Sequence, residues 1–302
     1  MKLTIAPRSP KSQKFPLTLD LAGTPADVKV ESVMSAIAKR FPQLSPDRQR
    51  LTIDKIALET GKSLADYGIK DGDSITFKDL GRQISWRTVF LIEYGGPMLI
   101  HPLIFYLPSL FYGQNFEHSW MQTVTYWMVM AHFLKREYET IFVHRFSHGT
   151  MPFRNVFKNS AHYHLLSGVN LAYWVYGPWN AAGAALAERS DALVYGCIAL
   201  FIFAELSNYS THVTLRNLRP PGTRVRAIPR GYGFNLVSCP NYFFETLAWL
   251  AVGVLTQSWA AHLFFVVAVG QMYIWAVKKH KSYRKEFTDY PRGRKAIFPL
   301  IA

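Results

Sequence analysis

Asn241, Tyr242 and Glu245 open a long apolar stretch near the C-terminus, and Glu245 is the only acid between residues 242 and 277. On a helix, Asn241 and Glu245 would lie one turn apart on the same face. Charged and polar groups at membrane depth are costly, so they face a partner or a polar cavity rather than lipid. Any one of these residues could be a structural hydrogen-bonding group, but their shared face favours a chemical site.

Other polar residues interrupt apolar segments in the same way. Glu93 lies within Ile92-Glu-Tyr-Gly-Gly-Pro97, and Glu205 and Asn208 fall near the end of another apolar segment. Because the same cost of exposure to lipid applies, the sequence predicts that these side chains also point toward partners or a polar cavity.

An arginine-rich loop comes just before this apolar stretch. Residues 216–234 contain five Arg and no acid. Arg binds phosphate through a planar, bidentate fork, and the Tyr and Phe in the loop suit stacking on a flat ring. These features favour a phosphate-bearing ligand, with Arg219 and Arg226 as candidates, over charges that only orient the chain in a membrane. No Gly-x-Gly-x-x-Gly motif follows a strand, so a dinucleotide would not be held by a Rossmann unit.

The apolar segments are long enough to be membrane spans, since a helix needs about 20 mostly apolar residues to cross. The sequence predicts about six crossings, at residues 86–111, 120–134, 161–180, 191–209, 237–256 and 258–276. The loops and the tail on one side would carry eighteen Lys and Arg, and the loops on the other side one. Cytosolic loops carry the excess of Lys and Arg, so both termini are predicted to be cytosolic.

The first eighty residues have a different pattern. Residues 1–6, 15–21, 50–53 and 74–77 resemble strands, and residues 30–41 repeat apolar side chains at the spacing of an amphipathic helix. This order is similar to the ubiquitin-like grasp. The expected fold is a multi-pass α-helical membrane protein, residues 81–302, with an N-terminal α+β ubiquitin-like domain, residues 1–80. The domain is expected to be a cytosolic packing domain, and a surface that recruits a partner is the alternative.

Composition argues against two other classes of protein. The net charge of +14 is explained by basic loops of a membrane protein, so a nucleic-acid partner is not expected. The two cysteines, Cys197 and Cys239, have no Cys/His neighbours at zinc spacing, so neither a metal site nor a disulfide framework is expected.

Several motifs together resemble a known family. They are Asn241-x-x-x-Glu245 with the Arg-rich loop before it, the tail Tyr283-x-Lys-x-Phe-x-Asp-Tyr-Pro, the stretches 142–152 and 231–242, and the ubiquitin-like start. In combination they resemble the steroid 5α-reductase superfamily and, within it, the very-long-chain trans-2-enoyl-CoA reductases of the endoplasmic reticulum. The resemblance spans essentially the whole chain.

The resemblance implies a function. It implies NADPH-dependent reduction of long-chain trans-2-enoyl-CoA to saturated acyl-CoA, the last step of each fatty-acid elongation cycle, which feeds sphingolipid synthesis. It also implies a multi-pass protein of the endoplasmic reticulum membrane, with the lipid bilayer and other fatty-acid elongation enzymes as partners.

The resemblance also implies roles for individual residues. Tyr242 corresponds to the catalytic tyrosine, and Glu93 to a glutamate on the substrate side. The positions that correspond to cofactor contacts are Asn208, Arg219, Asn241, Glu245 and Tyr283. The chain departs from the steroid reductases at Phe142, where they have a catalytic tyrosine. The proton donor must therefore differ, with Tyr242 in that role and His144 as the alternative.

Three alternative functions are weighed against this interpretation. A sterol or polyprenol reductase would share the cofactor and the hydride chemistry, but its substrate would lack the CoA phosphates. A non-enzymatic membrane adaptor that presents the N-terminal domain would leave the intramembrane Glu, Asn and Tyr side chains unexplained. A channel is disfavoured because the polar residues gather near one face rather than along the spans.

Overall fold

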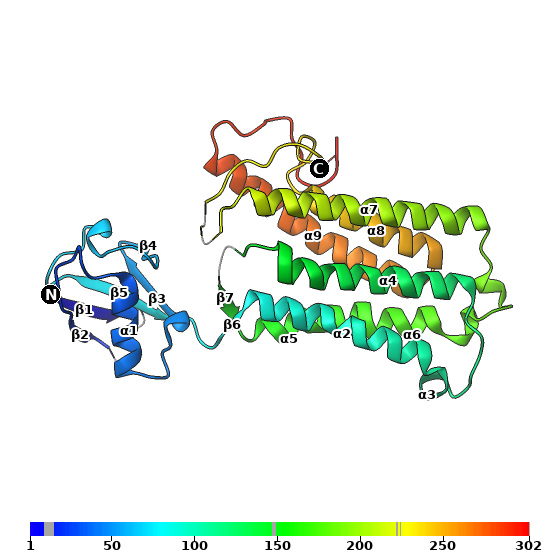
Figure 1. Ribbon diagram of the computed structural model, residues 1–302, viewed down its shortest axis with the longest axis horizontal. Helices are drawn as coiled ribbons and strands as arrows, with labels where there is room; N and C mark the ends of the chain where they lie inside the picture. The colour runs from blue at the N-terminus through cyan, green and yellow to red at the C-terminus, as the bar shows by residue number, and fades with distance from the viewer. Residues whose placement is uncertain (9–14, 147–148, 222, 224, 302) are drawn as a thin grey trace. The chain divides into compact units, whose positions relative to one another are not determined.

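The computed structural model describes residues 1–8, 15–146, 149–221, 223 and 225–301 (Figure 1). Its internal contacts divide the chain into two compact units. The first runs from Met1 to Ser85 and includes a short segment around residues 150–152, and the second contains the rest of the chain from Trp86 onward.

The N-terminal unit is built on a five-stranded sheet in the order β2-β1-β5-β3-β4. β1 and β5 are parallel and the other pairs are antiparallel. The strands are β1 Lys2–Pro7, β2 Leu17–Asp20, β3 Gln49–Ile53, β4 Ile56–Ala57 and β5 Ser74–Asp79, and the helix is α1 Val30–Arg40, with short 3-10 turns η1 Pro46–Arg48 and η2 Ala65–Tyr67. This is the ubiquitin-like arrangement that the sequence predicts, with β4 added.

The core of this unit follows the predicted periods. Along β1, Leu3 and Ile5 point inward and are fully buried, because side chains alternate across a strand. Along α1, Val30, Val33 and Ile37 recur at helical spacing and close over the sheet as one apolar cluster. A second, two-stranded sheet pairs β6 Gln83–Ser85 with β7 Thr150–Pro152.

The second unit is helical. Its elements are α2 Trp86–Tyr106, α3 Pro108–Tyr112, α4 Trp120–Tyr138, η3 Glu139–Val143, α5 Asn155–Ser160, η4 Ala161–Asn170, α6 Leu171–Tyr176, η5 Pro178–Asn180, η6 Ala185–Ala187, α7 Asp191–Asn217, α8 Pro240–Thr256 and α9 Trp259–Glu286. η3 and η4 are π-helical, and η4 continues α5 directly into α6. The long helices run side by side, with α7 along α8 (Figure 1).

Each of the six predicted apolar segments is mainly helical in the structure. Among the described residues, three helices, α2, α7 and α9, are long and apolar enough to cross a membrane. The α8–α9 boundary falls where the sequence predicts it, because Gln257 adopts a left-handed conformation (φ 50°) that ends α8. Six crossings remain a prediction for the other segments.

Packing gives the helical unit an inside and an outside. α2, α4, α6, α7, α8 and α9 all contribute to one apolar cluster. Many large apolar side chains are nevertheless exposed on the same helices, among them Leu99, Trp127, Leu134, Leu206, Val266 and Ile274. Faces of this kind suit lipid rather than water.

Candidate active site

A buried arginine on α4 organises a polar centre inside the helical unit. The Arg136 side chain donates from Nη2 to the Tyr94 hydroxyl at 2.8 Å and from Nη1 to Glu139 Oε2 at 2.7 Å. Arg136 is 9% exposed, and its guanidinium lies 5.1 Å from the centre of the Tyr94 ring. α2, α4 and η3 therefore meet around one fixed positive charge.

Two histidines extend this centre toward α7. His212 Nδ1 lies 2.9 Å from Glu139 Oε1, and the His144 ring lies 4.8 Å from that of His212. Burial would raise the pKa of Glu139, but His212 and Arg136 outweigh it and hold that pKa well below its ordinary value. Because Arg136 and Lys135 already neutralise Glu139, this cluster is an ion-pair network rather than a ready cation site.

His144 is the alternative proton donor predicted from the sequence. Burial, together with the positive charge of Arg136, lowers the pKa of His144 to about 2. The imidazole is therefore neutral at physiological pH and carries no acidic proton. This favours Tyr242 over His144 as the acid.

The predicted residues Asn241, Tyr242 and Glu245 lie in the first two turns of α8, which begins with Pro240 at its first position. Tyr242 is partly buried, and its hydroxyl lies within electrostatic range of Glu245, Arg136 and Tyr94. The fold thus brings the start of α8 to the same polar centre as α2 and α4.

Several buried polar atoms of the centre lack a hydrogen-bond partner among the described residues. They include Asn241 Oδ1 and Glu93 Oε1. Glu93 is 1% exposed, and its carboxyl group forms a hydrogen bond with the Asn159 side chain. Leaving such atoms unpaired is costly, so they are suited to a ligand that completes them.

Asn208 lies nearby but its side chain is occupied. Its Oδ1 accepts from Lys135 Nζ at 2.5 Å, and its Nδ2 donates to the Asn241 carbonyl at 2.8 Å. Lys135 also pairs with Glu205 at 2.6 Å, and Glu205 with His132 at 2.6 Å. Asn208 thus ties α4 and α7 to the start of α8, which suits a residue that positions Asn241.

The arginine-rich loop and the end of α9 form a second charged region. Arg226 pairs with Glu286 at 2.5 Å and lies 5.4 Å from the centre of the Tyr283 ring. Lys279 Nζ lies 5.9 Å from the same ring and within electrostatic range of Arg219 and Arg226. We call Arg219, Arg226 and Lys279 the cationic cluster. Arg224 of the same loop lies outside the described residues.

The donors of the cationic cluster are only partly used. Arg219 donates to the Arg145 carbonyl at 2.7 Å, and Arg145 donates to the Arg219 carbonyl. These reciprocal hydrogen bonds join the loop that contains Arg145 to the arginine-rich loop. Arg219 Nε is buried without a partner, and Lys279 makes no ion pair with a described residue. Free cationic donors beside an aromatic ring fit the phosphates and the flat base of a dinucleotide.

Sequence reasoning missed Tyr94, Arg136 and Lys279. Tyr94 directly follows Glu93, and in an apolar segment the charged Glu93 stands out whereas an aromatic residue does not. Arg136 was counted among the charges of a loop, whereas it is the last buried cation of α4. Its spacing from Glu139 was the available signal, because residues three apart on a helix are neighbours.

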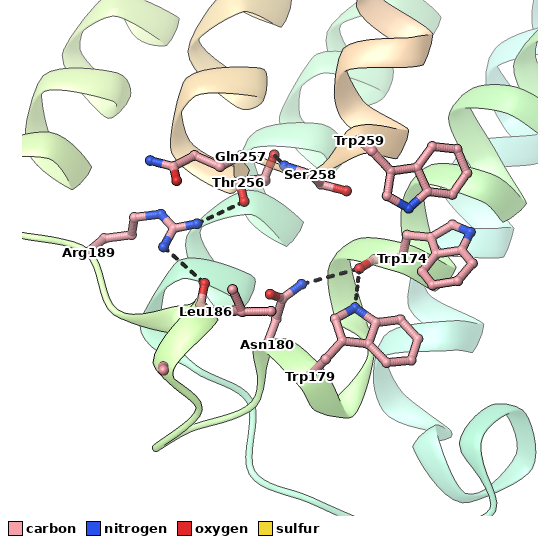
Figure 2. Close-up of a pocket in the computed structure, with 10 residues that line it drawn as sticks. Trp174, Trp179, Asn180, Leu186, Arg189, Thr256, Gln257, Ser258 and Trp259 are labelled. Atoms are coloured by element: carbon pink, nitrogen blue, oxygen red, sulfur yellow. Dashed lines mark hydrogen bonds between the residues drawn. The ribbon is translucent and has the colours of Figure 1, made fainter.

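A separate pocket of 380 Å³ lies at the other end of α8, lined by residues that include Trp174, Trp179 and Trp259 (Figure 2). Arg189 lies at its edge and donates to the carbonyls of Leu255 and Thr256. These are the last carbonyls of α8, which have no helical partner, so Arg189 caps that helix. The pocket is remote from Tyr242.

Comparison with known proteins identifies the family. Residues 149–302 match the family described as 3-oxo-5-alpha-steroid 4-dehydrogenase. The chain belongs to this steroid dehydrogenase family. The matched residues include the cationic cluster, the start of α8 and Tyr283, whereas Glu93, Tyr94 and Arg136 precede them.

Relatives extend the match to the rest of the chain. A Schizosaccharomyces pombe protein that carries the name enoyl reductase is 46% identical over 100% of both chains. The very-long-chain enoyl-CoA reductase of Dictyostelium discoideum is 43% identical over 81% of this chain and 80% of its own. A trans-2,3-enoyl-CoA reductase-like protein of Mus musculus is 31% identical over 90% of this chain and 77% of its own. This chain, as a member of the steroid dehydrogenase family, has three helices that could span a membrane. It is therefore a membrane protein.

Proposed function

We propose that this chain is a very-long-chain enoyl-CoA reductase, which converts trans-2-enoyl-CoA to saturated acyl-CoA with NADPH. The observation that carries the proposal is the start of α8, where Asn241, Tyr242 and Glu245 meet the polar centre beside the cationic cluster. Relatives with enoyl-CoA reductase names support the substrate class. The family supports a nicotinamide cofactor, and free cationic donors for an extra phosphate support NADPH over NADH.

When bound, the nicotinamide supplies the hydride that adds to the β-carbon of the enoyl thioester. The task of the chain is to stabilise the negative charge that develops on the thioester oxygen and to protonate the α-carbon. The Tyr242 hydroxyl is suited to proton donation, because it lies at the polar centre with no internal acceptor among the described residues. Asn241 Oδ1 is suited to accept a hydrogen bond from an amide of the cofactor.

The proposal extends to the cellular setting. We propose six crossings with both termini in the cytosol, because the basic loops and tail then share one side. That side holds the cationic cluster, so CoA and NADPH would bind from the cytosol. We also propose residence in the endoplasmic reticulum membrane beside other fatty-acid elongation enzymes, where the product would feed sphingolipid synthesis.

The proposal is tested with the purified full-length protein in detergent or lipid nanodiscs. We expect NADPH oxidation that depends on a long 2-enoyl-CoA, with much lower rates for NADH and for a steroid enone. Free CoA should compete with the substrate. Reduction of the steroid enone without competition by CoA would favour the sterol reductase alternative instead.

A further inference from the structure

The hydroxyl of Tyr94 differs from those of Tyr112 and Tyr176, two other tyrosines of the helical unit. It accepts a hydrogen bond from Arg136 at 2.8 Å, yet its own proton has no acceptor among the described residues. By contrast, the Tyr112 hydroxyl donates to the Tyr173 carbonyl, and the Tyr176 hydroxyl pairs with His101 Nδ1, both at 2.8 Å. Tyr94 is only 2% exposed, so water does not readily complete it. A buried O–H without an acceptor suits an oxygen supplied by a ligand.

Arg136 makes this O–H a stronger donor. Its guanidinium donates a hydrogen bond to the Tyr94 oxygen and so stabilises negative charge on that oxygen. Arg136 is in turn held by Glu139, and Glu139 by His212. The low polarity of the buried site increases the effect of this fixed charge.

The Tyr94 ring is held in one orientation. It stacks on Phe90 with a ring separation of 5.7 Å and meets Tyr163 edge to face at 5.1 Å. Two residues further along α2, a Cβ on Gly96 would lie 2.0 Å from the His164 ring, so only glycine allows this close approach of η4. His164 also contacts the Ile92 carbonyl at 2.8 Å, which fixes α2 against η4 next to Tyr94.

We propose that the Tyr94 hydroxyl is the oxyanion donor of the reaction, that Arg136 is a positioning residue acting through it, and that Tyr242 is left to protonate the α-carbon. This rests on the proposed function. Hydride from NADPH adds to the β-carbon, the carbon–carbon π electrons move toward the thioester, and the carbonyl oxygen becomes an enolate oxygen. Tyr94 donates a hydrogen bond to that oxygen and keeps its proton.

The proton balance is completed by the second phenol. As the enolate collapses to the thioester, the α-carbon takes the Tyr242 proton, and water restores the proton of Tyr242. Both phenols lie within electrostatic range of Arg136, which suits two donors acting on one substrate. The overall change is one hydride from NADPH and one proton from solvent.

The test compares Tyr94→Phe with Tyr112→Phe, which removes the hydroxyl of a half-buried tyrosine remote from the polar centre. Tyr94→Phe keeps the ring and its stacking. We expect its kcat with a long 2-enoyl-CoA to fall on the order of 10²-fold with a nearly unchanged KM, the scale for one lost oxyanion donor. Tyr112→Phe should retain wild-type kcat.

A spectroscopic readout separates a catalytic role from a structural one. A 4-dimethylaminocinnamoyl-CoA thioester absorbs at longer wavelength when its carbonyl oxygen receives a strong hydrogen bond. With NADP⁺ present, we expect this red shift in the wild-type protein and in Tyr242→Phe, and its loss in Tyr94→Phe. Arg136→Lys keeps the positive charge but loses the bidentate guanidinium, so it should give a smaller red shift. This variant provides the test if Tyr94→Phe proves unstable.

The outcomes discriminate between the two proposals. Wild-type kcat and a full red shift in Tyr94→Phe would overturn the role of Tyr94. Loss of the shift in Tyr242→Phe but not in Tyr94→Phe would assign the oxyanion to Tyr242 instead. If the wild-type protein fails to oxidise NADPH with any 2-enoyl-CoA, the proposed function itself fails, which is a distinct result.

Discussion

The two ends of α8 both meet arginines, but they use them differently. At the far end, Arg189 donates to the carbonyls of Leu186 and Thr256 (Figure 2). It also donates to the carbonyls of Glu188 and Leu255. At the first turn of α8, Asn241 Oδ1 is left unpaired. The Tyr94 hydroxyl proton in the polar centre and Arg219 Nε in the cationic cluster also lack partners among the described residues. The C-terminal end of α8 therefore borders an open pocket, whereas the unpaired hydrogen-bond donors and acceptors belong to the polar centre and the cationic cluster.

This difference teaches that cavity volume does not by itself mark a site. The far pocket is lined by three tryptophans, and the indole of Trp179 already donates to the Trp174 carbonyl (Figure 2). Aromatic residues at a helix end are typical of a membrane interface. Buried polar atoms that the protein leaves incomplete are the stronger signal for chemistry.

The largest effect should come from Tyr242→Phe. Removing the proposed α-carbon proton donor should lower kcat on the order of 10²-fold or more, while NADPH binding and folding persist, because only the hydroxyl is lost. Steady-state rates and tryptophan-fluorescence titration with NADPH would measure both. Turnover close to wild type in a folded, cofactor-binding protein would remove Tyr242 from the chemistry.

The cationic cluster should give a smaller, selective effect. Lys279→Met should raise the KM for NADPH about tenfold or more, the cost of one lost charged contact, with little change in the KM for NADH. Lys278→Met is a matched control, because Lys278 is exposed and next in sequence. An equal effect of Lys279→Met on both nucleotides would place Lys279 away from the extra phosphate.

His144 should make the polar centre sensitive to acid. Its folded pKa is about 2, whereas an unfolded histidine titrates near 6.5, so the unfolded chain binds the additional proton as the pH falls below about 6.5. Stability should therefore decline below that pH, by about 2 kcal/mol at pH 5 for this residue. His144→Asn should flatten the fall of the unfolding temperature between pH 7 and 5. An unchanged slope in that variant would mean that His144 is not buried in its neutral form.

A substitution of Arg189, at the C-terminal end of α8, should change the stability of the protein but not its activity. Arg189→Gln should lower the free energy of unfolding by about 1 kcal/mol, because it leaves terminal carbonyls of α8 without their donor. The kcat with enoyl-CoA should stay at the wild-type value, since the substituted residue caps the helix end remote from Tyr242. Thermal unfolding and steady-state kinetics on one preparation would check this. A loss of kcat with unchanged stability would reverse the contrast between the two ends.

Much of the architecture could be predicted from the sequence. Apolar length marks α2, α7 and α9, and alternation marks β1 and β5, because each pattern reflects burial within one element. The two-residue β4 and the β6–β7 pair were missed because such short strands have no period of their own. They are defined by a partner elsewhere in the chain.

The site could be predicted only in part, for a related reason. Asn241, Tyr242 and Glu245 were identifiable because polar residues at the start of an apolar helix stand out. Tyr94 resembles any aromatic residue of a span, and Arg136 any cation at a helix end. Their roles emerge only when α2 packs against α4 and buries both.

The most direct test of the account follows a label from NADPH deuterated at the transferring position of its nicotinamide. Purified wild-type protein is incubated with this cofactor and a long trans-2-enoyl-CoA, and the product is examined by mass spectrometry. The account predicts one deuterium at the β-carbon and a solvent-derived hydrogen at the α-carbon, formed far more slowly by Tyr242→Phe. A saturated product without the label, or equal labelling rates in both proteins, would contradict it.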